Sequence, residues 1–169
     1  MEQVTIYRAK GKQIGLVFLF KYCLNGHLRG FSIDSGELNE IQQKWLFSSN
    51  FPSNEEKMID WKVKMSEKFE VEVSPADTSF EALWELYDYK VSKADSIKAF
   101  KKLSPGDQIK CFIDVPFYKK YLEKNPGIGI LHLSTYINKR RFEDERPGKA
   151  AQKVYNKSLH DLAAKKTNK

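Results

Sequence analysis

The spacing of apolar residues changes near Phe80, and this change divides the chain into two kinds of structure. Before Phe80 apolar residues alternate with polar ones, as in residues 69–73 (FEVEV), which is typical of half-buried strands. From there on they recur about every 3.6 residues, so Phe80, Leu83, Trp84 and Tyr87 share one helix face. We therefore predict an α+β chain: a small antiparallel β-sheet with one or two helices, then a small helical module and a basic C-terminal tail.

The chain is predicted to have three parts. Residues 1–78 are expected to form a β-rich α+β domain, residues 79–145 a helical module, and residues 146–169 a basic tail. Residues 139–169 hold ten Lys and Arg against four Asp and Glu, which gives +6 of the total net charge of +7. A concentrated basic end is typical of a polyanion-binding protein, and a merely solubilising tail is the alternative.

Three strand patterns open the chain and predict an antiparallel meander. Asn25-Gly26 is expected to form a type I′ hairpin turn, because both residues tolerate positive φ. An earlier turn is predicted at residues 10–12, and the strand of residues 69–73 returns to the sheet. The strands of the meander are residues 4–9, 13–24 and 27–34.

Two short helices are predicted between the meander and the last strand. Asp34 or Ser35 is expected to cap the first, and Asn54 to cap the second. The apolar face of the first helix is Leu38, Ile41, Trp45 and Leu46, and that of the second is Met58, Ile59 and Trp61.

Four helical elements are predicted after residue 78. Thr78 or Ser79 caps the first, and Ser104 caps the third, with Pro105 at its first position. Pro116 is expected to kink or split the third helix. The second helix covers residues 93–103 and buries Ile97, Phe100 and Leu103; the fourth covers residues 134–141, with Tyr136 and Phe142 packed inward.

Two motifs in this region resemble a known module. The first has the spacing F-x-x-x-W-x-x-Y-x-x-K-x-x-K-x(6)-W/F-x-K-L and comprises Phe80, Trp84, Tyr87, Lys90, Lys93, Phe100, Lys102 and Leu103. The second joins residues 135–138 (TYIN) to residues 141–144 (RFED). Together they resemble the C-terminal helical module of phage replication proteins, of the replisome-organiser or helicase-loader type, over residues 80–145.

The chain departs from that family at several positions. Asp88 and Leu133 stand where the family usually has proline, and Phe100 and Phe142 replace tryptophan. Residues 1–78 do not resemble the winged-helix half that such proteins usually carry, and the sequence has no G-x-x-x-x-G-K-[ST] phosphate-binding loop. The resemblance implies a DNA-associated replication module.

The candidate DNA-binding residues are cations and one aromatic residue. Lys139, Arg140 and Arg141 end the fourth helix and are predicted to contact phosphate, although Arg141 could instead pair with Glu143 or Asp144. Tyr89 lies off the apolar face and could stack on a base. The other candidates are Lys90, Lys93, Lys149, Lys153 and Lys157. Trp84, Tyr87, Tyr136 and Phe142 are predicted to be core, because helical spacing explains them.

Catalysis and metal binding have little support in the sequence. The three histidines (His27, His132, His160) are scattered, and solvated acids are the commoner reading of Glu143 to Glu145 than a Mg²⁺ site. We expect no cofactor and no enzymatic activity. No secretion signal or membrane span is apparent, and Cys23 and Cys111 are predicted to be reduced, buried thiols of a cytoplasmic protein, in the host cytoplasm if the chain is viral.

The sequence leads to two functional hypotheses. The first is a non-enzymatic, phage-type DNA-replication accessory protein that binds DNA through its basic C-terminal part and a protein, such as a replicative helicase, through its N-terminal half. The alternative is a virion component or host-machinery inhibitor that acts purely through protein–protein contacts.

Overall fold

The computed structural model describes residues 3–147, and these residues form two compact units. We call Val4–Ala76 the N-terminal unit, and residues 77–147 the helical unit. A four-stranded antiparallel sheet lies in the first and only helices in the described part of the second, so the predicted α+β class is confirmed. The two units divide between Ala76 and Asp77, two residues before the predicted division after residue 78.

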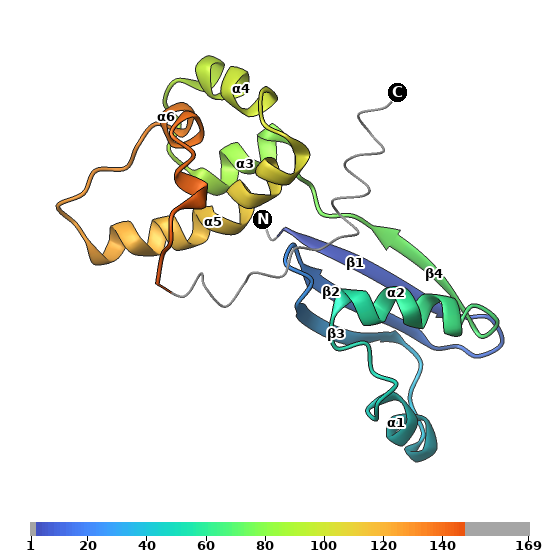
Figure 1. Ribbon diagram of the computed structural model, residues 1–169. Helices are drawn as coiled ribbons and strands as arrows, with labels where there is room; N and C mark the ends of the chain where they lie inside the picture. The colour runs from blue at the N-terminus through green and yellow to red at the C-terminus, as the bar shows by residue number, and fades with distance from the viewer. Residues whose placement is uncertain (1–2, 148–169) are drawn as a thin grey trace. The chain divides into compact units, whose positions relative to one another are not determined.

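The sheet has the strand order β3-β2-β1-β4, with every neighbouring pair antiparallel. The first three strands form the predicted meander, and β4 returns to pair with β1 on its other side (Figure 1). The strands are β1 Val4–Gly11, β2 Val17–Cys23, β3 Leu28–Ser35 and β4 Phe69–Ser74.

Both hairpin turns differ from the prediction. Strand β1 continues through Gly11, so the first turn moves to residues 12–15 and β2 begins only at Val17. In the second hairpin Gly26 takes φ +80° and donates its N–H to the carbonyl of Cys23 at 2.8 Å, whereas Asn25 stays outside the left-handed region. This turn is not type I′, because type I′ needs positive φ at both central residues. A left-handed glycine at the end of a turn, with Cys23 N–H bonded to the carbonyl of His27, is typical of a bulged hairpin turn.

Helices α1 (Glu40–Leu46) and α2 (Glu55–Lys64) follow β3, and α2 lies across the sheet (Figure 1). Asn54 caps α2 as predicted, but Asn39 rather than Asp34 or Ser35 caps α1, through a reciprocal pair of hydrogen bonds with Gln42. The predicted apolar face of α1 is wrong in part, because Leu46 is buried whereas Ile41 and Trp45 are exposed. On α2, Met58 and Trp61 are buried and Ile59 is exposed.

Aromatic rings fill the space between the sheet and α2. Phe20 is fully buried, and its ring centroid lies 5.8 Å from that of Trp61 and 5.0 Å from that of Phe31. Phe18 stacks on Phe69 at 5.4 Å, which ties β2 to the first residue of β4. Aromatic contacts of this kind add stability beyond the burial of their area.

The helical unit contains four α-helices and one 3₁₀ turn in its described part (Figure 1). Ser79 and Ser104 accept the predicted capping hydrogen bonds at the starts of the first and third helices. Pro116 does not split the third helix, which continues for 20 residues around it, and the fourth predicted helix ends early and is followed by the 3₁₀ turn. The elements are α3 Phe80–Tyr87, α4 Lys93–Lys101, α5 Pro105–Lys124, α6 Leu133–Asn138 and η1 Arg141–Glu143.

Two further observations concern the whole described chain. Between residues 3 and 147, no helix has the length and apolar composition needed to cross a bilayer. No disulfide joins Cys23 and Cys111 within residues 3–147; Cys111 is buried as predicted, whereas Cys23 is only partly buried. Burial raises the pKa of the Cys111 thiol above its ordinary value, which keeps this thiol protonated and unreactive.

Candidate nucleic-acid interface

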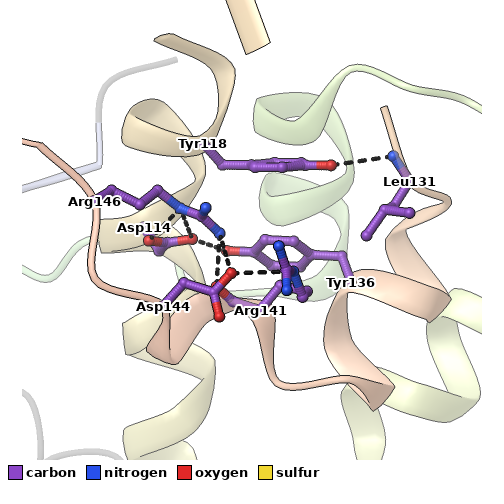
Figure 2. Close-up of polar contacts among 7 residues, drawn as sticks. All are labelled: Asp114, Tyr118, Leu131, Tyr136, Arg141, Asp144 and Arg146. Carbon is purple, nitrogen blue, oxygen red and sulfur yellow. Dashed lines mark hydrogen bonds and ion pairs between the residues drawn. The ribbon is translucent and has the colours of Figure 1, made fainter. Parts of the chain in front are cut away.

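A buried ionic network lies at the centre of the helical unit (Figure 2). The carboxylate of Asp114 on α5 accepts a hydrogen bond from Tyr136 Oη at 2.6 Å and one from Arg146 Nε at 3.1 Å. The side chains of Arg146 and Asp114 are 4% and 0% exposed. Buried charges persist only when they are paired and hydrogen-bonded, and here each is.

Arg146 makes more contacts than this one ion pair. Its Nη2 donates to the carbonyl oxygen of Arg141 at 2.7 Å and pairs with Asp144 at 3.2 Å (Figure 2). The guanidinium also lies 4.9 Å from the centre of the Tyr118 ring. Arg146 is the first residue of the predicted basic tail, but it lies buried inside the helical unit, where its charge is not available to a polyanion.

Three tyrosine hydroxyls complete the interior of the unit. Tyr87 Oη donates to the carbonyl of Leu131 at 2.8 Å, and Tyr118 Oη accepts from the N–H of the same residue at 3.1 Å. Burial, followed by the neighbouring carboxylate of Asp114, raises the pKa of Tyr136, so its hydroxyl stays protonated and donates. Trp84, Tyr87, Tyr136 and Phe142 are all buried, which confirms that they belong to the core.

The three cations predicted to bind phosphate differ in their ion pairing: Arg140 and Arg141 pair with acids, whereas Lys139 is exposed. Arg140, in a left-handed turn with φ 49°, pairs with Glu143 at 2.8 Å and with Asp107 at 3.2 Å. Arg141 pairs with Asp144 at 3.0 Å, which is one of the two internal partners considered for it. Lys139 remains exposed at the end of α6.

These ion pairs also shift the ionisation of the acids involved. Hydrogen bonds from Arg140 hold the pKa of Glu143 below its usual value. Burial alone would raise the pKa of Asp107, but hydrogen bonds from Lys110 and Arg140 outweigh it and lower that pKa. Arg140 and Arg141 are therefore weaker candidates for phosphate contact than lysines that have no carboxylate beside them.

The candidates between α3 and α4 differ in their surroundings. Tyr89 is half-buried, with its ring 5.7 Å from that of His132, so its faces are only partly accessible for stacking. Lys90 Nζ pairs with Glu85 at 2.9 Å and donates to the carbonyl of Trp84 at 2.7 Å. Lys93 is exposed at the start of α4. The tail candidates Lys149, Lys153 and Lys157 lie outside the described residues.

Helix α4 carries a lysine surface that was not among the predicted site residues. Its inward side buries Ser96, Ala99 and Phe100. The opposite side exposes three lysines at i, i+3 and i+4, which share one helix face. Within residues 3–147 none of the three has an acidic partner. We call Lys98, Lys101 and Lys102 the α4 lysine face. Helical spacing alone predicts that these lysines are exposed. The sequence does not reveal that no acidic side chain of the described residues lies close enough to pair with them.

The N-terminal unit offers a different kind of surface. An apolar groove of about 290 Å³ lies beside α1, and we call it the α1 groove. The one charged residue among the described residues that line it is Lys68. The groove is lined chiefly by Ile14, Leu16, Leu38, Ile41, Trp45 and Met65.

The described residues provide no metal site. Between residues 3 and 147 no group of three His, Cys, Asp or Glu side chains is placed to hold a metal ion. Glu143 and Asp144, which were considered as Mg²⁺ ligands, are instead held by arginines.

Part of the chain matches the model of a known protein family. The family model of the Legionella vir region protein LvrA C-terminal domain matches residues 75–140, which run from just before α3 to the left-handed turn at Arg140. No curated protein and no solved structure matches the chain. The helical unit is therefore similar to that domain over most of its described length, and this match carries no link to phage replication.

Proposed function

We propose that this chain is a non-enzymatic DNA-binding accessory protein of DNA replication, of phage type. It contacts DNA through the α4 lysine face and the basic residues after Pro147, and it contacts a protein through the N-terminal unit. The observation that carries the proposal is that the α4 lysine face has no acidic partner in the part of the chain that the structure describes.

Unpaired lysines suit phosphate binding for a thermodynamic reason. A lysine that meets a phosphate displaces condensed counterions from the nucleic acid, and their release drives binding. A cation such as Arg140 must first give up Glu143 and Asp107, so its net gain is smaller. The resemblance of residues 80–145 to phage replication modules supports the replication role. Some of its motif residues have a structural role instead: Phe80 and Phe100 are core residues whose ring centroids lie 5.8 Å apart.

Replacing the α4 lysine face by alanine should weaken DNA binding and reduce its dependence on salt. Three lost phosphate contacts correspond to a decrease of about 2 to 3 in the slope of log affinity against log salt. The measurement is a fluorescence-anisotropy titration of labelled single- and double-stranded DNA at several salt concentrations.

A matched control removes three exposed lysines from α2, namely Lys57, Lys62 and Lys64. This control removes the same charge from the N-terminal unit and should leave the slope unchanged. Equal slopes for the α4 variant and the unmodified protein would contradict the role of α4.

Deletion of residues 148–169 tests the second basic element. This segment holds six lysines and one aspartate, so its loss should lower the salt slope by about 4 to 5 if all six lysines contact phosphate. The deletion must keep Arg146, because removing that buried residue would also damage the fold. Circular dichroism identical to that of the full chain is the control, and unchanged DNA affinity would exclude the tail.

Two observations favour the alternative function, a virion component or host-machinery inhibitor that acts by protein contact alone. Internal pairing of Arg140 and Arg141 lowers the number of cations available to DNA. The α1 groove is an apolar surface of the kind that proteins use to bind proteins. Absence of DNA binding even at low salt would leave this alternative as the function.

A further inference from the structure

The exposed side of α1 carries protruding apolar side chains, which we call the ridge, beside the α1 groove. Ile41 is 80% exposed, and Trp45, one turn further on, is 38% exposed. Phe47, which ends the helix, and Ile14, from the β1–β2 connection, are 57% and 43% exposed. Figure 1 shows α1 beyond β3 within the N-terminal unit, separate from α2. The ridge adjoins the α1 groove, because Ile14, Ile41 and Trp45 also line it.

This surface is larger than stray exposed side chains explain. The three residues that also line the groove, Ile14, Ile41 and Trp45, expose roughly a few hundred Å² of apolar surface together, which is the size that marks an interaction site. A helix of seven residues is only marginally stable by itself and depends on burying its apolar side chains. The monomer leaves Ile41 and Trp45 exposed, so these two side chains do not stabilise α1 in the monomer.

We propose that a second copy of this chain covers the α1 face, in a two-fold pair in which Ile41 of each copy enters the α1 groove of the other. This deepens the protein-contact part of the proposed function and does not depend on DNA binding. A two-fold interface must be self-complementary, and a ridge beside a hollow on one face meets that requirement.

The charges of the N-terminal unit favour a second copy as the occupant. Residues 1–76 hold ten Lys and Arg and ten Asp and Glu, so two copies of this half do not repel each other. With Lys68 as the one charged lining residue within the described chain, the groove has the apolar centre that is typical of homodimers.

Helix α1 also carries charges that match in a two-fold pair. Glu40 begins the helix and Lys44 lies one turn later, on the same exposed side as Ile41. When two α1 helices pair antiparallel, Glu40 of each copy faces Lys44 of the other. Neither residue has an ion pair within residues 3–147, so both are available for this contact.

Sedimentation equilibrium of the full chain at micromolar concentration, after nuclease treatment and in high salt, tests the proposal. The molar mass measured for the unmodified protein should be twice that of one chain, which is 19.7 kDa. Ile41→Glu should raise the dissociation constant by about 30-fold or more, as expected for a residue at the centre of an interface. Val63→Glu is the matched control, because Val63 is 71% exposed on α2 and lies outside the groove, and it should leave the dimer intact.

A charge exchange tests the two-fold geometry. Lys44→Glu places two glutamates opposite each other and should weaken the dimer, whereas the double change Glu40→Lys and Lys44→Glu should restore it. The proposal would be overturned if the unmodified protein were monomeric or if Ile41→Glu left the dimer intact. It would equally be overturned if Val63→Glu weakened the dimer as much, or if the double change failed to restore it. Loss of the dimer with DNA binding retained separates this inference from the DNA-binding proposal.

Discussion

Replacing Asp114 by alanine is expected to destabilise the helical unit by about 3–5 kcal/mol. The change leaves the guanidinium of Arg146 buried with its main counter-ion gone, and it leaves the Tyr136 hydroxyl without its acceptor at 2.6 Å. Arg146 keeps its pair with the half-buried Asp144, but the loss of its fully buried counter-ion costs more than the lost hydrogen bonds alone. Urea unfolding followed through the indole N–H signals in NMR spectra measures the effect for each unit, because Trp84 reports the helical unit and Trp61 the N-terminal unit.

A surface ion pair in the same unit provides the control. Glu85 pairs with Lys90 at 2.9 Å but is 69% exposed, so Glu85→Ala should change stability by less than about 1 kcal/mol. The double variant Asp114→Ala with Arg146→Met removes both buried charges and should recover part of the loss. A change at Asp114 no larger than that at Glu85 would show that the network does not hold the unit together.

The sequence predicts the elements of this network better than the network itself. Tyr136 and Phe142 could be assigned to the core because helical spacing fixes the direction of their side chains. Asp114 stands in an apolar stretch of α5 and Arg146 directly after three acids, 32 residues later, and periodicity carries no information on pairing at that distance. The pairing of Asp114 with Arg146 is therefore visible only in the three-dimensional structure.

The errors in the N-terminal unit have a similar physical cause. Ile41 and Trp45 have the spacing of a buried face, but α1 has only seven residues and Leu46 alone anchors it as a buried residue within the helix. Periodicity shows that residues share a face and does not show that another element covers it. For the candidate site, exposure of the α4 lysines could be predicted from spacing, whereas their lack of acidic partners depends on the placement of distant acids.

The stability of the N-terminal unit is expected to fall as the pH rises from about 4.5 to about 8. Glu55, in the first turn of α2, is 2% exposed, and Tyr7 Oη donates to its Oε1 at 2.8 Å. Its Oε2 is buried without a hydrogen-bond partner in the described structure. Burial raises the pKa of Glu55 from 4.5 to about 7, and the hydrogen bond from Tyr7 offsets only part of this effect.

The direction of the pH effect follows from proton binding. The folded unit binds the Glu55 proton more tightly than the unfolded chain, so this stabilisation is complete below pH 4.5 and is lost as the pH rises through 7. The free energy of unfolding should decrease by about 3 kcal/mol over that range. Urea unfolding at several pH values, followed through the Trp61 indole signal, measures the decrease.

Two neighbouring substitutions isolate the Glu55 carboxyl. Glu55→Gln keeps an oxygen that can accept from Tyr7 but cannot ionise, so its unfolding free energy should lose this pH dependence and exceed that of the unmodified protein at pH 8. Glu56→Gln changes the adjacent, exposed carboxyl in the same helical turn and should preserve the decrease. If Glu55→Gln retained the decrease, another titratable group would cause it, and the pH effect would not come from the Glu55 carboxyl. Since a helix N-terminus favours a carboxylate, a raised pKa at this position means that desolvation outweighs the helix dipole.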